Sequence, residues 1–146
     1  MIPTNTTTFM HITHYFKPGE ILPGEGAWVF LLKTPVSPDL SPAELINAFY
    51  ETGYLAAYND AFAEMYGFEQ PDELVGFQLS DFIPPSNNIF ELLETMIKNG
   101  FKLEKGISKE QDRVGKTIYF QNKMEVLFEN GLIIGGKGTQ IPVEKP

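Results

Sequence analysis

The chain has 146 residues, of which 19 are acidic and 11 are basic, so it carries a formal net charge of −8. Its length fits a single domain, and its 42% hydrophobic and 13% aromatic content fits an ordered globular protein. Binding to a phosphate backbone depends largely on clustered Lys and Arg, so the acidic balance argues against a nucleic-acid partner. The absence of cysteine excludes disulfides, thiolate nucleophiles and cysteine-ligated metals.

No apolar run reaches the roughly 18 residues that a membrane span needs, and the first residues lack the pattern of a secretory signal. We therefore expect a soluble, cytoplasmic protein without a membrane partner. Residues 1–26 predict an N-terminal arm with a β-like segment over residues 8–16. The arm holds both histidines, His11 and His14. We interpret them as solvated and assign no metal site, because no acidic residue or cysteine lies near them in sequence.

The next part of the chain predicts two strands with a helix between them. Residues 27–32 (AWVFLL) form an apolar run of strand length, which is typical of a strand buried on both faces. After a loop, the capping box at residues 41–44 (SPAE) begins a helix that ends at residues 52–53. A short strand over residues 54–58 follows.

Residues 58–76 (YNDAFAEMYGFEQPDELVG) predict a capped helix, a stop and a second short helix. Asn59 is a good N-cap. Three apolar side chains share one face of the helix that follows: Phe62, Met65 and Tyr66. Gly67 ends this helix, and Gly76 ends a further helix of about one turn.

A helical turn over residues 79–83 precedes a longer helix over residues 86–99. The longer helix carries the most regular apolar stripe in the chain: Ile89, Leu92, Leu93, Met96 and Ile97. Strands over residues 101–107, 117–128 and 132–139 fill the rest of the chain. This order of elements predicts an α+β fold, with the helices gathered on one face of an antiparallel sheet.

Alternation over residues 117–128 places two sets of side chains on opposite faces of the predicted strand. One face holds Ile118, Phe120, Asn122, Met124, Val126 and Phe128. The other holds Tyr119, Gln121, Lys123, Glu125 and Leu127. Asn130 and Gly131 then predict a tight hairpin turn. Gly135 and Gly136 lie inside the last strand, where they predict either a bulge or space for a ligand.

Two parts of the sequence resemble a known family. The segment YNDAFAEMYGFEQPDELVGFQLSDFIP resembles the helical part of a PAS domain. The last three strands, with the DRVG turn, the ENG hairpin and the GTQ ending, are similar to the end of that domain. The resemblance covers residues 27–140 and leaves residues 141–146 as a tail or the start of a linker to an output domain. The insertion over residues 31–53 resembles that of a subset of PAS domains.

This resemblance implies a five-stranded antiparallel sheet with short helices and one longer helix packed on one face. It also implies a sensory signal-transduction module, commonly bacterial and homodimeric, that is not itself an enzyme. The output domains of such modules include histidine kinases of two-component systems, diguanylate cyclases and transcription regulators. Pro142 stands where PAS domains that are fused to output domains often have Asp, which weakens the expected polar link to a downstream helix.

The resemblance does not identify a cofactor, but it narrows the range of cofactors to consider. The photosensing branch of the family attaches flavin to a cysteine, so the absence of cysteine excludes that covalent adduct. The haem-binding branch takes a histidine from the longer helix, and residues 86–100 contain none. We therefore do not expect conventional haem ligation, although His11 or His14 reaching across a dimer stays an open alternative.

A candidate ligand pocket lies between the helical arm, the longer helix and the sheet. Its candidate residues are Phe62, Met65, Tyr66, Phe82, Leu93, Met96, Ile97, Ile118, Phe120, Asn122 and Met124. Asn122 is the informative residue, because it is polar on an otherwise apolar face. In the alternative interpretation these side chains fill a core and Asn122 satisfies a backbone group at a bulge, which fits a ligand-free dimerisation scaffold. Structural roles are expected for Asn59, Gly67, Gly76 and Gly131.

A third hypothesis is a small cone-shaped α+β enzyme of the ketosteroid-isomerase type, which uses a buried Asp as its base. Against it, the apolar face of residues 117–128 carries no acid. Glu104, Glu110 and Asp112 lie near Arg113, and we interpret this polar run as a solvated hairpin. No nucleophile–base pair stands out, so we assign no catalytic residues.

Overall fold

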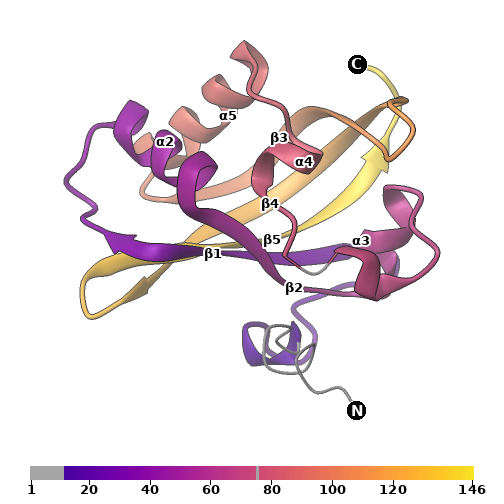
Figure 1. Ribbon diagram of the computed structural model, residues 1–146, viewed down its shortest axis with the longest axis horizontal. Coiled ribbons are helices and arrows are strands. Elements are labelled where there is room, and N and C mark those ends of the chain that lie inside the picture. The colour runs from indigo at the N-terminus through magenta and orange to yellow at the C-terminus, as the bar shows by residue number, and fades with distance from the viewer. Residues whose placement is uncertain (1–11, 75) are drawn as a thin grey trace.

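The computed structural model describes residues 12–74 and 76–146. In chain order the elements are η1 (Ile12–His14), β1 (Gly26–Val36), α2 (Pro42–Thr52), β2 (Gly53–Tyr58), α3 (Asp60–Met65), η2 (Pro71–Leu74), α4 (Leu79–Phe82), α5 (Asn87–Lys98), β3 (Lys102–Gln111), β4 (Thr117–Glu129) and β5 (Leu132–Val143). Helices α2, α4 and α5 lie on one face of the sheet, which we call the inner face, and η1 lies on the opposite, outer face (Figure 1).

The five strands form one antiparallel sheet in the order β2-β1-β5-β4-β3. The first and last strands of the sequence are therefore neighbours at the centre of the sheet. β4 and β5 form a long hairpin, in which Asn130 (φ 53°) and Gly131 (φ 80°) both adopt the left-handed conformation of a tight turn. The predicted α+β class with a five-stranded antiparallel sheet is confirmed.

Three strands are longer than the sequence predicts, because pairing with a neighbour extends them. β1 continues beyond Leu32 to Val36, where it pairs with Ile133 of β5, so part of the predicted loop is strand. β3 continues beyond Ile107 to Gln111, which pairs with Thr117 at the start of β4. β5 continues into the predicted C-terminal tail, where Val143 pairs with β4.

The N-terminal arm also differs from the prediction. Residues 12–14 form a 3-10 helix that ends in the exposed His14, so the expected β-like segment is not extended there. His11 and residues 8–10 lie outside the described residues, so the interpretation of His11 as solvated stays a prediction. Phe16 is buried against Ala27 and Val29 of β1, so the segment after η1 packs on the outer face of the sheet.

The core on the inner face has an aromatic part and an aliphatic part. Residues of α3 and α4 gather with β-strand residues into the aromatic part, where the ring of Tyr66 lies 4.9 Å from those of both Phe62 and Phe82. Met96 of α5 packs with Leu103 and other aliphatic side chains in the second part. Fully burying a side chain of this size stabilises the fold by about 1.5–3 kcal/mol, so the two parts hold the helices on the sheet.

Local capping fixes where the helices begin. Ser41 and Glu44 form the predicted capping box of α2. Asn59 caps α3 by accepting from the backbone N–H of Phe62 (3.0 Å), and the same oxygen accepts from the N–H of Ala27 (2.9 Å). Asn59 therefore fixes both the start of α3 and its attachment to β1. Within residues 12–74 and 76–146, no helix is both long and apolar enough to cross a lipid bilayer.

Candidate functional site

A cavity lies between the helices and the inner face of the sheet. The centres of water molecules have room in it over about 70 Å³, and a single buried water needs about 10–15 Å³ on this measure. The cavity therefore has room for several waters or one compact organic molecule. Seven of the predicted pocket residues line it: Phe62, Tyr66, Phe82, Leu93, Met96, Asn122 and Met124.

The other four predicted pocket residues lie outside the cavity lining. Ile118 packs against the aromatic part of the core and Ile97 against the aliphatic part. Phe120 is completely buried, with its ring 5.4 Å from that of Tyr66. Met65 packs next to Gly26, where an added Cβ would lie 2.8 Å from its sulfur. These four side chains support the walls of the cavity.

Glu125, which pairs with Lys137, also borders the cavity. Five further polar side chains form a strip across the lining, and each is at most 3% exposed: Tyr66, Ser108, Glu110, Asn122 and Gln140. Two chains of hydrogen bonds connect them. Nε2 of Gln140 donates to Oη of Tyr66 (3.0 Å), which donates to Oε1 of Glu110 (2.5 Å). Nδ2 of Asn122 donates to Oγ of Ser108 (2.8 Å), which donates to Oε2 of Glu110 (2.6 Å). Both chains end at the carboxyl group of Glu110.

Burial raises the pKa of two side chains in this strip, Glu110 and Tyr66. It raises the pKa of Glu110 to about 7, although the hydrogen bonds from Ser108 and Tyr66 oppose the change. Burial, followed by the nearby charge of Glu110, raises the pKa of Tyr66 well above its usual range. Glu110 is therefore the group in the cavity that changes charge near neutral pH.

The interpretation of residues 104–112 as a solvated hairpin is wrong for Glu110. Glu104 is exposed, and Asp112 accepts from the N–H groups of Val114 (3.0 Å) and Lys116 (2.8 Å) in a turn. Glu110 is instead 2% exposed, because β3 continues past Ile107 and turns this side chain inward. The apolar face of residues 117–128 carries no acid, but the neighbouring strand β3 supplies Glu110 to the same cavity.

Asn122 has both of the roles that the sequence leaves open. Its amide nitrogen donates to the carbonyl oxygen of Gly106 (3.1 Å), beside the irregular pairing of β3 between Leu103 and Gly106. The same nitrogen donates to Ser108, and the side chain lines the cavity. Asn122 thus satisfies a backbone group at a bulge and also joins the polar strip.

The sequence prediction misses Ser108, Glu110 and Gln140. Ser108 and Glu110 share the inward face of β3 with Gly106, because side chains alternate along a strand. Continuing the alternation of β3 by two pairs of residues would have found both. Gln140 lies in the GTQ ending used for the resemblance, but only its pairing with Asn122 across β4 and β5 reveals that it is buried in the cavity wall.

Glycines shape the sheet beneath the cavity. A Cβ at Gly135 would collide with the carbonyl oxygen of Phe30, so Gly135 lets β5 approach β1 next to an irregularity in the pairing. Gly136 lines the cavity. Both predicted roles of these two glycines, an irregularity in the strand and space beside a cavity, are therefore present. A Cβ at Gly138 would lie 2.5 Å from the indole of Trp28. The Nε1 atom of that indole is buried and has no hydrogen-bond partner among the residues that the structure describes.

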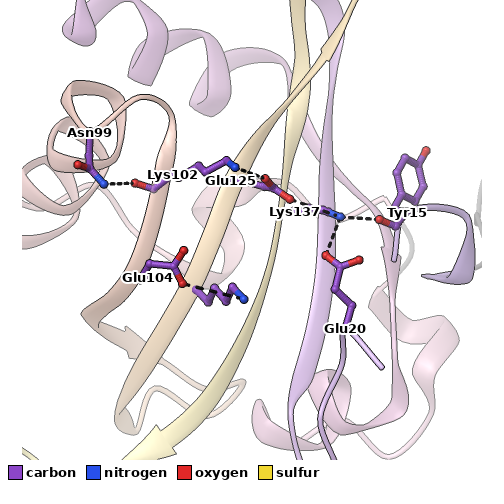
Figure 2. Close-up of polar contacts among 8 residues, drawn as sticks. Tyr15, Glu20, Asn99, Lys102, Glu104, Glu125 and Lys137 are labelled. Carbon is purple, nitrogen blue, oxygen red and sulfur yellow. Dashed lines mark hydrogen bonds and ion pairs between the residues drawn. The ribbon is translucent and has the colours of Figure 1, made fainter. Parts of the chain in front are cut away.

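A second charged cluster lies on the outer face of the sheet, where the chain supplies its own cation (Figure 2). Nζ of Lys137 donates to the carbonyl oxygen of Tyr15 (2.7 Å) and pairs with Glu20 (3.0 Å) and Glu125 (3.5 Å). The ammonium also lies 4.7 Å from the ring centroid of Phe16. These contacts hold the segment after η1 against the sheet.

No protein-family model matches the chain, and the search of curated proteins found no match. Solved structures do match. A PAS domain from Colwellia psychrerythraea has a TM-score of 0.60 at 14% identity, over 84% of this chain and 89% of that one.

Two light-oxygen-voltage (LOV) domains are similar as well. The LOV domain of a blue-light activated histidine kinase from Erythrobacter litoralis has a TM-score of 0.54 at 15% identity, over 85% of this chain and 99% of that one. A fungal LOV photoreceptor has a TM-score of 0.55 at 11% identity, over 88% and 81% of the two chains. Together with the sheet order and the helices on the inner face, these similarities show that the chain has the fold of a PAS domain, as the sequence resemblance implies.

Proposed function

We propose that this domain is a sensory PAS module that binds a small molecule in its internal cavity and relays the bound state to an output domain or to a second copy of the chain. The polar strip that ends at Glu110 carries this proposal. Burying polar groups is costly, and a core with no other role is filled more stably by apolar side chains. Ligand pockets, in contrast, combine apolar walls with a few placed polar groups.

The domain itself is not an enzyme in this proposal, and it acts in the cytoplasm. Any catalysis belongs to a separate output domain. Such an output domain is a histidine kinase, a diguanylate cyclase or a transcription regulator. The similarity to a LOV domain of a histidine kinase supports an output of this kind. A homodimer is the expected assembly.

A flavin does not fit the cavity. The chain has no cysteine for a covalent adduct. The cavity is also much smaller than the roughly 300–1,000 Å³ of typical cofactor and drug sites, so a three-ring flavin would require the helices to move. A compact ligand is the better match.

Native mass spectrometry of the purified protein tests the proposal against a ligand-free scaffold. We expect a co-purifying small-molecule mass on a dimer. Leu93→Phe should reduce the ligand-bound fraction, because Leu93 lines the cavity and the larger ring takes up its space. Ile97→Phe is the matched control, since Ile97 lies on the same helix but outside the lining.

The opposite results would favour the scaffold. A dimer that carries no additional mass after expression in several hosts contradicts ligand binding. Equal loss of the bound mass in both variants would show that helix packing, and not the cavity, controls binding. Circular dichroism on each variant separates loss of the ligand from loss of the fold.

A second candidate function is proton abstraction by Glu110, in a small enzyme of the ketosteroid-isomerase type. The observation that favours it is a carboxyl group, buried in an apolar cavity, whose pKa is raised to about 7. It ranks second because both oxygens of Glu110 already accept hydrogen bonds from Tyr66 and Ser108. If a test ketone exchanged its α-protons with the wild type no faster than with Glu110→Gln, this candidate would be ruled out.

A further inference from the structure

The hydrogen bonds around Glu110 all point their donated hydrogens toward its carboxyl group. The amide nitrogens of Gln140 and Asn122 can only donate, so each hydroxyl that accepts from them turns its own hydrogen toward the carboxyl group. Tyr66 then donates to one oxygen of Glu110 and Ser108 to the other. A carboxyl group that accepts on both oxygens is arranged as a carboxylate. The polar strip is thus built around a negative charge.

No residue in the described ranges, 12–74 and 76–146, supplies a positive charge that pairs with this carboxyl group. The titratable groups that face Glu110 are the phenols of Tyr66, at the end of α3, and Tyr50, on α2. Lys109 is next to Glu110 on β3 but is exposed. In the described part of the chain, no Lys, Arg or His side chain forms an ion pair with Glu110, although Lys137 pairs with two acids on the outer face. A buried carboxylate without a cation is costly, so a cation that enters the cavity would be stabilised.

The rest of the cavity lining suits a cation that carries an alkyl group. Aromatic side chains supply much of the lining, among them Trp28, Phe30, Phe49, Phe62 and Phe82. The faces of aromatic rings attract ammonium groups, and the attraction is stronger where water is excluded. The small volume limits the body of such a ligand to a compact alkyl group.

We infer that the cavity binds a small aliphatic ammonium ion, with its charged nitrogen at the carboxylate of Glu110 and its alkyl group against the aromatic side chains. This inference rests on the proposed function, because it names the ligand class for the same cavity. It separates this chain from the LOV domains that share its fold, which are described as blue-light receptors.

Two probes of the same shape test the inference. Isobutylammonium and isobutanol each have one polar hydrogen-bonding group on the same alkyl body, and they differ in charge. Isothermal titration of the full chain at pH 8.5 should show the ammonium binding at least about tenfold more tightly than the alcohol. At pH 5.5 this preference should fall by about tenfold, because Glu110 is then protonated while the amine keeps its charge. The affinity for isobutanol should not change.

Two variants test whether Glu110 causes the preference for isobutylammonium over isobutanol. Glu110→Gln should bind both probes equally at pH 8.5, and Glu104→Gln, on the exposed face of the same strand, should keep the wild-type preference. If Glu110→Gln does not fold, the two probes and two pH values still decide the matter in the wild type. Loss of the preference in both variants would assign it to the net charge of the chain and overturn the inference.

The outcomes also separate this inference from the proposed function. If isobutanol binds as tightly as isobutylammonium at pH 8.5, the ammonium inference is wrong, while small-molecule binding in the cavity stands. If neither probe binds, the inference is wrong as well, and the native mass spectra decide whether the cavity takes a ligand of another class.

Discussion

The two faces of the sheet hold carboxylates in contrasting ways. On the outer face, the N–H of Lys17 and the ammonium of Lys137 lower the pKa of Glu20. On the inner face, burial raises the pKa of Glu110 to about 7, and its hydrogen-bond partners are neutral. The outer cluster is complete within the chain and serves to attach the N-terminal segment. No cation among the described residues pairs with Glu110, which is why we propose that a ligand binds in the cavity.

The largest expected effect is a dependence of stability on pH that comes from Glu110. Its pKa is about 7 in the folded protein and near 4.5 when unfolded, so the folded state holds the proton more tightly between these values. The stabilisation is complete below pH 4.5 and is lost as pH rises through 7. It amounts to about 3 kcal/mol in the free energy of unfolding of the ligand-free protein.

Urea unfolding at several pH values between 4 and 8 measures this effect. The difference in the free energy of unfolding between wild type and Glu110→Gln should change by about 3 kcal/mol across the range, because Gln does not titrate. Glu104→Gln should follow the wild-type curve. If the free energy of unfolding changed with pH equally in wild type and Glu110→Gln, the pKa of Glu110 would not be raised by folding, and the contrast with Glu20 would be wrong.

A smaller effect is expected from breaking the outer cluster. Lys137→Met removes the cation shared by Tyr15, Glu20 and Glu125, and the side chain of Lys137 is only 12% exposed. We expect a loss of about 2 kcal/mol in urea unfolding and faster proteolysis of residues 12–25. Lys123→Met is the control: its ion pair with Glu104 is exposed and 4.0 Å long, so its loss should cost under about 0.5 kcal/mol. Equal losses in both variants would mean that Lys137 is an ordinary surface residue.

The smallest effect is expected at Asn122, which joins the polar strip to the sheet. Asn122→Ala removes the donor to Gly106 and Ser108 and should lower the free energy of unfolding by about 1–2 kcal/mol. If Asn122 also positions Ser108 for a ligand, isobutylammonium should bind more weakly to this variant. Unchanged binding, together with an unchanged cavity, would restrict Asn122 to the bulge.

Short-range patterns predicted most of the elements. The capping residues Ser41 and Asn59 set the starts of α2 and α3, and the Asn130-Gly131 turn set the hairpin. Strand ends were predicted less well, because Val36 and Val143 owe their conformation to pairing with a strand distant in sequence. The apolar part of the candidate site was also predictable, since α5 and β4 have regular periodicity.

The sequence by itself determined the helix starts, the hairpin, the apolar faces and the chemistry that an absence of cysteine excludes, because each depends on residue types or on neighbours a few positions apart. Only the tertiary structure decided that Glu110 is buried. The charge environment of Glu110 depends on Tyr66, which lies 44 residues earlier in the chain. Burial and the presence or absence of a cation are properties of the space around a side chain, and that space is built by strands and helices that meet only when the chain folds.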